Sequence, residues 1–153
     1  MMKRFTMAAL SLLGAMAAGS GVAQTFQCPA GTARVISGTP ANPNNGTGDF
    51  TSFITGATIC AVRGTDRWQE FHRSDGKLID WKRGANDAVD PTKEVGLWKS
   101  VTGADAAVTH TYGITSFVWA ICQVGTGLTY TLVSPTGGTV TGATIRAGQV
   151  ACP

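Results

Sequence analysis

Hydrophobic and polar residues alternate with a period of two along much of the chain after residue 24, which predicts β-strands. Between Ser116 and Gln123, for example, Phe117, Trp119 and Ile121 share one face. Gly-rich turn sequences recur about every 8–12 residues, the spacing of a sandwich or barrel. No segment there keeps the 3.6-residue period of an amphipathic helix. The predicted strands are Thr32–Ser37, Thr51–Val62, Arg67–Arg73, Lys77–Arg83, Glu94–Val101, Ala106–Tyr112, Thr115–Gln123, Leu128–Ser134 and Thr139–Ala147.

Glycine, proline and asparagine mark where these strands should stop. Gly56 predicts a bulge or a break inside the long candidate Thr51–Val62. The segments Thr39–Gly48, Gly84–Thr92 and Ser134–Gly138 are predicted loops because they concentrate turn-forming residues. We see no internal repeat and no linker, so the pattern predicts a single domain.

The first residues have the composition of a signal peptide rather than of a folded element. Lys3 and Arg4 precede the apolar segment Met7–Ala18, and Gly21-Val22-Ala23 follows as a small-residue cleavage site. We therefore expect residues 1–23 to be removed and residues 24–153 to form the mature domain. The Ala-rich segment is typical of bacterial export, so we expect a periplasmic or extracellular protein. No later segment is apolar enough for a membrane span.

Removal of the signal peptide would bring the net charge of the chain close to zero. The formal charge of +3 includes Lys3 and Arg4, so the mature chain has ten basic and nine acidic residues and is close to +1. A nearly neutral domain lacks the basic surface that nucleic acids or anionic membranes require. We expect neither as a partner.

The four cysteines all belong to the mature chain. An even number in an exported protein predicts two disulfides, and wide spacing without a Cys-x-x-Cys motif argues against a metal site. Three pairings are possible, and we favour Cys28–Cys60 with Cys122–Cys152, of which the second would tie the last strand back onto a strand three hairpin turns earlier. Together with the strand pattern, this predicts an all-β fold: a single-domain antiparallel barrel or sandwich with two disulfides.

Charge and aromatic residues gather in one segment. Fifteen of the 21 charged residues and three of the four tryptophans lie between Arg63 and Lys99. Within it, Ser74-Asp75-Gly76 fits a type I turn that closes on a left-handed glycine, which predicts a hairpin between Arg67–Arg73 and Lys77–Arg83. In this register Glu70 faces Asp80, Phe71 faces Ile79 and His72 faces Leu78. Phe71, Ile79 and Trp81 then share an apolar face that we expect to be the core side.

The opposite face of this hairpin brings together Glu70, Asp80 and His72. Like charges directly opposite one another destabilise a sheet unless something compensates them. We interpret the face first as a solvated or structural ion network. Its alternatives are a divalent metal site and a set of acid–base groups for hydrolysis. We expect no cofactor. The other histidine, His110, is predicted to be a half-buried structural residue on its strand.

The tryptophans provide the other candidate contacts. Trp68 and Trp98 are possible stacking surfaces for a flat ligand, although tryptophans are more often part of a core. Gly96-Leu97-Trp98 resembles the Gly-x-Trp with which a barrel strand begins in lipocalins, and the series of strands after it is similar to that class of small secreted barrel. In lipocalins the motif lies near the start of the mature chain. The resemblance implies a fold and no binding residues.

These observations give three hypotheses about function. The first is a non-enzymatic binding or interaction module that contacts a small ligand, glycan or protein through residues 63–99. The second is a small secreted hydrolase or metal-site protein that uses Glu70, His72 and Asp80. The third is a structural subunit of a surface assembly, a possible homo-oligomer, suggested by the strands rich in Thr, Gly and Ala.

Overall fold

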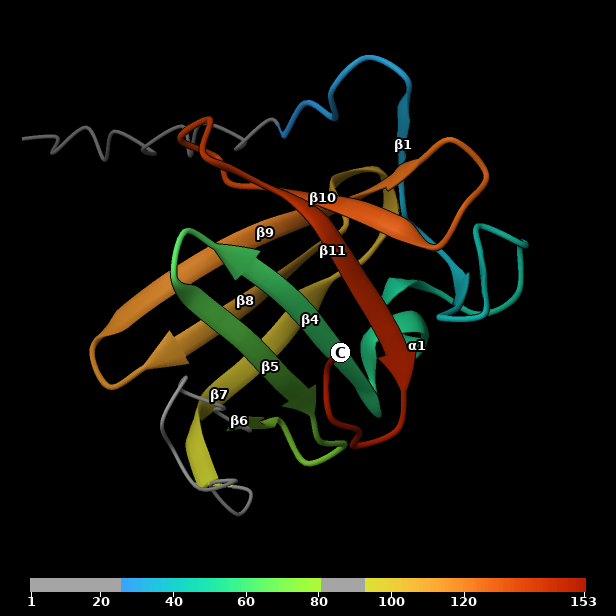
Figure 1. Ribbon diagram of the computed structural model, residues 1–153. Helices are drawn as coiled ribbons and strands as arrows, with labels where there is room; N and C mark the ends of the chain where they lie inside the picture. The colour runs from blue at the N-terminus through green and yellow to red at the C-terminus, as the bar shows by residue number, and fades with distance from the viewer. Residues whose placement is uncertain (1–25, 81–92) are drawn as a thin grey trace, which may run out of the picture.

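The computed structural model describes residues 26–80 and 93–153 (Figure 1). The predicted signal peptide, Trp81 and the predicted loop Gly84–Thr92 lie outside the described residues.

The described residues form a β structure that agrees closely with the predicted strands. Seven of the nine predictions match an observed strand within a few residues. Lys77–Arg83 is confirmed as far as Asp80, where the description stops. Thr51–Val62 is correct only in its second half. The observed strands are β1 (Thr32–Arg34), β2 (Gly38–Thr39), β3 (Asn42–Pro43), β4 (Ala57–Arg63), β5 (Asp66–His72), β6 (Lys77–Asp80), β7 (Lys93–Val101), β8 (Ala107–Tyr112), β9 (Thr115–Val124), β10 (Thr129–Val133) and β11 (Thr139–Ala147).

The eight strands from β4 to β11 form a closed antiparallel barrel. Each pairs with the next along the chain, and β11 returns to pair with β4. Strand β1 extends the sheet by pairing with the end of β9, from Thr32 opposite Val124 to Arg34 opposite Cys122. The predicted all-β fold is therefore confirmed, and the structure selects the barrel over the sandwich. In the predicted loop Thr39–Gly48, the short strands β2 and β3 pair with each other.

A short helix precedes the barrel where the sequence predicted a strand. Helix α1 (Phe50–Ile54) begins at Asp49, whose carboxylate accepts a hydrogen bond from the Ser52 backbone N–H at 2.8 Å. Five residues are too few to show a helical period, which explains the wrong prediction. The predicted break at Gly56 is correct: this residue has φ +72° and separates α1 from β4.

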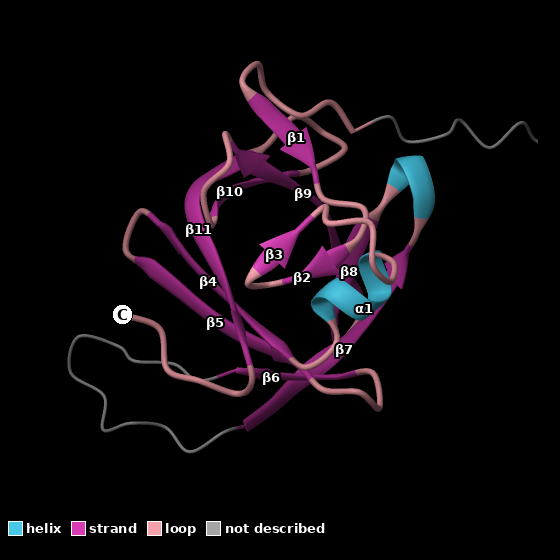
Figure 2. Ribbon diagram, turned by 90° about the vertical axis from the view of Figure 1, so that its right-hand side faces the viewer, coloured by secondary structure: helices cyan, strands magenta, loops and turns pink. Residues whose placement is uncertain are grey.

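The two ends of the barrel differ. Helix α1 lies at one end beside the β2–β3 pair (Figure 2), and Phe50, Phe53 and Ile54 are completely buried in the core. Strand β4 leaves this end at Ala57 and finishes at the exposed Arg63. The turn between β4 and β5 therefore lies at the opposite end.

Two disulfides connect the ends of the chain to the barrel, but not in the favoured pairing. Cys28 is bonded to Cys122 on β9, and Cys60 on β4 is bonded to Cys152. The favoured pairing was wrong because barrel closure places segments that are distant in sequence side by side. Two disulfides indicate an oxidising compartment. Among the described residues no helix is long and apolar enough to cross a membrane.

Candidate functional site

The β5–β6 hairpin has the predicted register and the opposite orientation. Glu70 faces Asp80, Phe71 faces Ile79 and His72 faces Leu78, as expected, and Gly76 closes the turn with φ +82°. The face predicted to be polar, however, points into the barrel, although Ile79 on the apolar face is also buried. Glu70 and His72 are buried, with 7% and 0% of their surface exposed, and they belong to the barrel interior. Of the two forms of the first interpretation, the solvated face is therefore wrong for these two residues, whereas a structural ion network agrees with the ion pair between Glu70 and His110.

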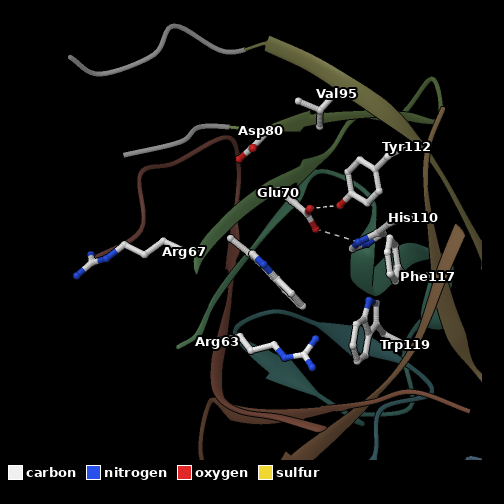
Figure 3. A pocket seen from close by; sticks show the side chains of 10 residues that line it. Arg63, Arg67, Glu70, Asp80, Val95, His110, Tyr112, Phe117 and Trp119 are labelled. Carbon is white, nitrogen blue, oxygen red and sulfur yellow. Dashed lines mark hydrogen bonds and ion pairs between the residues drawn. The ribbon is translucent and has the colours of Figure 1, made fainter. Parts of the chain in front are cut away.

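A chain of hydrogen bonds explains how the interior accepts these polar groups. His72 Nδ1 lies 3.1 Å from the Ala57 carbonyl oxygen, and His72 Nε2 lies 2.9 Å from His110 Nε2. His110 Nδ1 lies 2.9 Å from Glu70 Oε2, and the Tyr112 hydroxyl donates to Glu70 Oε1 (Figure 3). Buried polar groups are tolerated when they are bonded in this way.

The positions of the protons follow from one acceptor. The Ala57 carbonyl can only accept, so His72 Nδ1 carries a proton and, in neutral His72, Nε2 accepts the N–H of His110. One further proton then lies between His110 Nδ1 and Glu70 Oε2. The network is thus a directed chain that ends at Glu70, whose Oε1 accepts the Tyr112 hydrogen bond and whose Oε2 forms an ion pair with His110.

Burial and neighbouring charges fix the ionisation of this chain. Complete burial, reinforced by His110, lowers the pKa of His72 to about 3, so this ring is neutral at pH 7. Burial alone would raise the pKa of Glu70, but His110 and the Tyr112 hydroxyl outweigh it, and the pKa of Glu70 is lowered. Glu70 is therefore a carboxylate. Burial and the nearby Glu70 raise the pKa of Tyr112, so its hydroxyl keeps its proton.

Glu70 and Tyr112 face a cavity of about 290 Å³ inside the barrel. Its position follows from strand alternation, because β5, β8 and β9 each direct every second side chain inward. The aromatic lining comes from Trp68 on β5, Tyr112 on β8, and Phe117 and Trp119 on β9. The remaining lining residues are Arg63, Arg67, Glu70, Asp80, Val95 and His110.

The cavity opens at the end of the barrel opposite α1. Arg63 ends β4 and Arg67 lies near the start of β5; both are exposed. Arg67 extends away from Glu70 and His110 in Figure 3. Phe117, at the same end, has 46% of its surface exposed. Arginines and an accessible aromatic ring therefore surround the opening, whereas the ionised Glu70 lies deeper.

The sequence identified part of this site. It named Glu70, Asp80 and Trp68, which all line the cavity. It also named His72, which forms a hydrogen bond with the lining residue His110. Trp98 has a different position: its indole N–H donates to the Arg73 carbonyl at 2.8 Å and its ring packs edge-on against His72. Trp98 is not a lining residue of the cavity.

The sequence missed the residues that come from β8 and β9. His110 was expected to be half-buried and structural, yet it is buried, with 2% exposed, and it bonds both His72 and Glu70. Its alternation with Tyr112 was a signal that both point to one side of the strand. Nothing in the sequence indicated that this side faces β5 across the barrel.

Metal binding was one alternative for the charged face. Within residues 26–80 and 93–153, no group of three or more His, Cys, Asp or Glu side chains is arranged to hold a metal ion.

The class of molecule is thus a disulfide-linked, eight-stranded antiparallel barrel with a polar network and a cavity open at one end. Comparison of the chain with protein-family models, with curated proteins and with solved structures finds no match.

Proposed function

We propose that this protein is an exported binding protein that holds a small molecule in the barrel cavity. The observation that carries the proposal is the cavity itself: about 290 Å³, open at one end, with four aromatic side chains among its ten lining residues. Ligand sites in proteins are typically concave and mostly apolar, with a small number of fixed polar groups. The volume is at the lower end of this class, so a ligand of one or two rings fits best.

The hydrogen-bond network supports binding because it fixes the polar groups before a ligand arrives. Glu70 is held by His110 and Tyr112, and His110 is held by His72. A site whose side chains are already ordered loses less entropy on binding. The expected contact surface, residues 63–99, is therefore extended by the proposal to His110, Tyr112, Phe117 and Trp119.

The compartment is part of the proposal. Two disulfides and a signal-peptide pattern over residues 1–23 favour a periplasmic or extracellular protein. An exported barrel with an aromatic-lined cavity would suit a carrier or sensor of a small molecule.

Blocking the cavity tests the proposal. Val95 lines the cavity, whereas Val101 on the same strand is exposed at the other end of β7. With indole as a neutral aromatic probe, we expect calorimetric binding to wild type and to V101F with equal affinity. V95F should bind at least about tenfold more weakly, because the larger ring occupies the probe's space. Absence of indole binding to wild type, or equal binding to V95F, would contradict the proposal.

A second candidate is acid–base catalysis, favoured by the Glu70–His110 contact beside the cavity. A carboxylate held by an imidazole is a common arrangement for proton transfer. The hydrolase hypothesis then relies on Glu70 and His110, with His72 as a positioning residue and Asp80 as a second acid. Turnover of fluorogenic esters or glycosides by wild type and by E94Q, but not by E70Q, would favour this candidate.

The structural-subunit hypothesis rests on strand edges, which the closed ring β4–β11 does not offer. Concentration-dependent oligomers in analytical ultracentrifugation would favour it, and a strict monomer would count against it.

A further inference from the structure

We propose that the cavity selects an aromatic ligand that carries a carboxylate, with its ring inside the barrel and its carboxylate bound by Arg63 at the opening. This inference rests on the proposed binding function and adds the chemical class of the ligand. Three features of the described residues carry it: the internal pairing of the buried charges, the inward position of Arg63 and the aromatic wall beside it.

The buried charges of the cavity are already compensated by one another. Glu70 Oε2 lies 2.9 Å from His110 Nδ1, and the proton between these two atoms leaves the pair without net charge. Glu70 Oε1 accepts the hydroxyl of Tyr112, and Asp80 also has an interaction partner. Taking one member of a buried pair to bind a ligand would leave the other uncompensated, which is costly. The interior therefore suits the uncharged part of a ligand.

Arg63 is a cation that the fold directs toward the cavity. On β4, Ile59 and Ala61 are buried in the core, and Arg63 comes two residues after Ala61. Strand alternation therefore places all three on the inner side of the barrel. In Figure 3 the guanidinium of Arg63 points toward Trp119. The inner row of β4 thus ends in a positive charge at the opening.

Arg67 shares the opening but has the opposite orientation. It alternates with Trp68 and precedes the buried Glu70 by three residues, so it belongs to the outer side of β5. Figure 3 shows it extending away from Glu70. Within residues 26–80 and 93–153, neither arginine forms an ion pair or a side-chain hydrogen bond. The guanidinium of Arg63 can therefore offer two parallel N–H groups to a ligand carboxylate.

The aromatic wall nearest to Arg63 suits the ring of such a ligand. Trp68 lies opposite Ala61, two residues before Arg63, and its ring centroid is 5.6 Å from that of Trp119. Both tryptophans line the cavity together with Arg63. This pair leaves no room for a ring between its members, so a flat ligand would lie against them. A short acidic side chain on that ring would then meet the guanidinium at the opening.

Three indole derivatives of similar shape isolate charge. Indole-3-acetate carries a carboxylate, indole-3-acetamide is its neutral analogue, and tryptamine carries an ammonium. By calorimetry at pH 7, we expect wild type to bind indole-3-acetate about five- to tenfold more tightly than indole-3-acetamide, and tryptamine more weakly than the amide. High salt should reduce the advantage of the carboxylate, because Arg63 is exposed to solvent.

Matched variants then identify the group responsible. R63Q should weaken indole-3-acetate about five- to tenfold while indole-3-acetamide changes less than about twofold. R67Q is the control, because it makes the same change of net charge at the same opening, and both probes should change less than about twofold. Asp66 lies opposite Arg63 in the strand register, so D66N should leave the preference for the carboxylate unchanged or larger. Arg63 and Arg67 are both exposed, and exposed substitutions of this kind leave a fold intact.

The outcomes separate this inference from the proposed function. If indole-3-acetamide binds and indole-3-acetate gains nothing, the carboxylate inference is wrong and the binding function stands. Tightest binding of tryptamine would overturn the inference as well. Equal losses in R63Q and R67Q would contradict the role of Arg63. If neither indole nor any of its three derivatives binds, both proposals fail.

Discussion

At the scale of single residues, one backbone carbonyl determines the chemistry of the barrel interior. The Ala57 oxygen fixes the proton of His72 Nδ1, and this sets the direction of the hydrogen bond to His110. His110 in turn presents Nδ1 to Glu70. The Ala57 carbonyl does not line the cavity, yet through His72 and His110 it sets the hydrogen bonding around Glu70, which does. The consequence is a measurable dependence of stability on pH.

We expect acidification to destabilise the fold through His72. Its pKa is about 3 when folded and near 6.5 when unfolded, so below pH 6.5 the unfolded chain takes up a proton that the folded chain excludes. Between pH 6.5 and pH 5 this lowers the free energy of unfolding by about 2 kcal/mol. Glu70 acts in the same direction only at lower pH, because its lowered pKa matters below its unfolded value of 4.5.

Urea unfolding of wild type and H72Q at several pH values between 5 and 7 measures this effect. Glutamine does not titrate, so the slope of stability against pH should become smaller in H72Q, whatever the stability of this variant at pH 7. An unchanged slope would show that His72 does not carry the pH dependence.

At the scale of elements, the sequence predicts which residues of the β5–β6 hairpin face each other, but not which face of the hairpin points into the barrel. Ser74-Asp75-Gly76 defines the turn, and the turn fixes that Glu70 faces Asp80. Which side of the hairpin faces inward depends on His110 and Tyr112, about forty residues later. Without those partners a buried Glu70 would be costly, so local reasoning left a solvated face and a structural ion network both open and did not identify His110 as a partner. The same limit applies to α1, which is too short to show a period and is positioned by packing of Phe50 and Phe53.

Gly76 and Gly96 are glycines for different reasons. Gly76 has φ +82°, and an added Cβ would meet only the Trp98 carbonyl oxygen at 3.6 Å, an ordinary contact. A Cβ on Gly96 would lie 2.2 Å from the Thr111 carbonyl oxygen on β8, so the backbone would have to move. The glycine of Gly96-Leu97-Trp98 is therefore needed for close approach of two strands.

We expect G96A to be the more destabilising substitution. G76A should cost about 1–2 kcal/mol for the left-handed conformation, whereas G96A should cost at least about 3 kcal/mol because it separates β7 from β8. Urea unfolding of both variants measures the difference. A cost for G96A equal to or below that of G76A would contradict the steric argument.

At the scale of the whole molecule, closure of the barrel brings together what is far apart in sequence. The strand pattern, the turn positions and the presence of two disulfides were predictable from local sequence. The disulfide pairing was not, because it depends on β11 lying beside β4 and on the last residues returning along the barrel wall. Gly148 donates to the Gly56 carbonyl oxygen at 2.7 Å, and the Cys152 backbone N–H donates to Gln69 Oε1 at 2.7 Å.

The two disulfides should stabilise the barrel without being needed to close it. Their cysteines are separated by 94 and 92 residues, so the loss of unfolded-state entropy is nearly the same for both, and removing either pair should cost about 2–5 kcal/mol. Closure itself depends on backbone hydrogen bonds between β11 and β4, which neither disulfide replaces. We therefore expect C28A/C122A and C60A/C152A each to unfold cooperatively in urea at lower midpoints, with similar losses.

Indole binding distinguishes a disulfide that only stabilises the fold from one that is needed to close the barrel. If backbone pairing closes the barrel, folded C28A/C122A and C60A/C152A should bind indole within about twofold of wild type, provided that wild type binds it. Loss of indole binding in C60A/C152A at a urea concentration where it is still folded would mean that the bond between Cys60 and Cys152 holds β4 in place. In that case the disulfide would control the shape of the cavity, because β4 ends at Arg63 beside its opening.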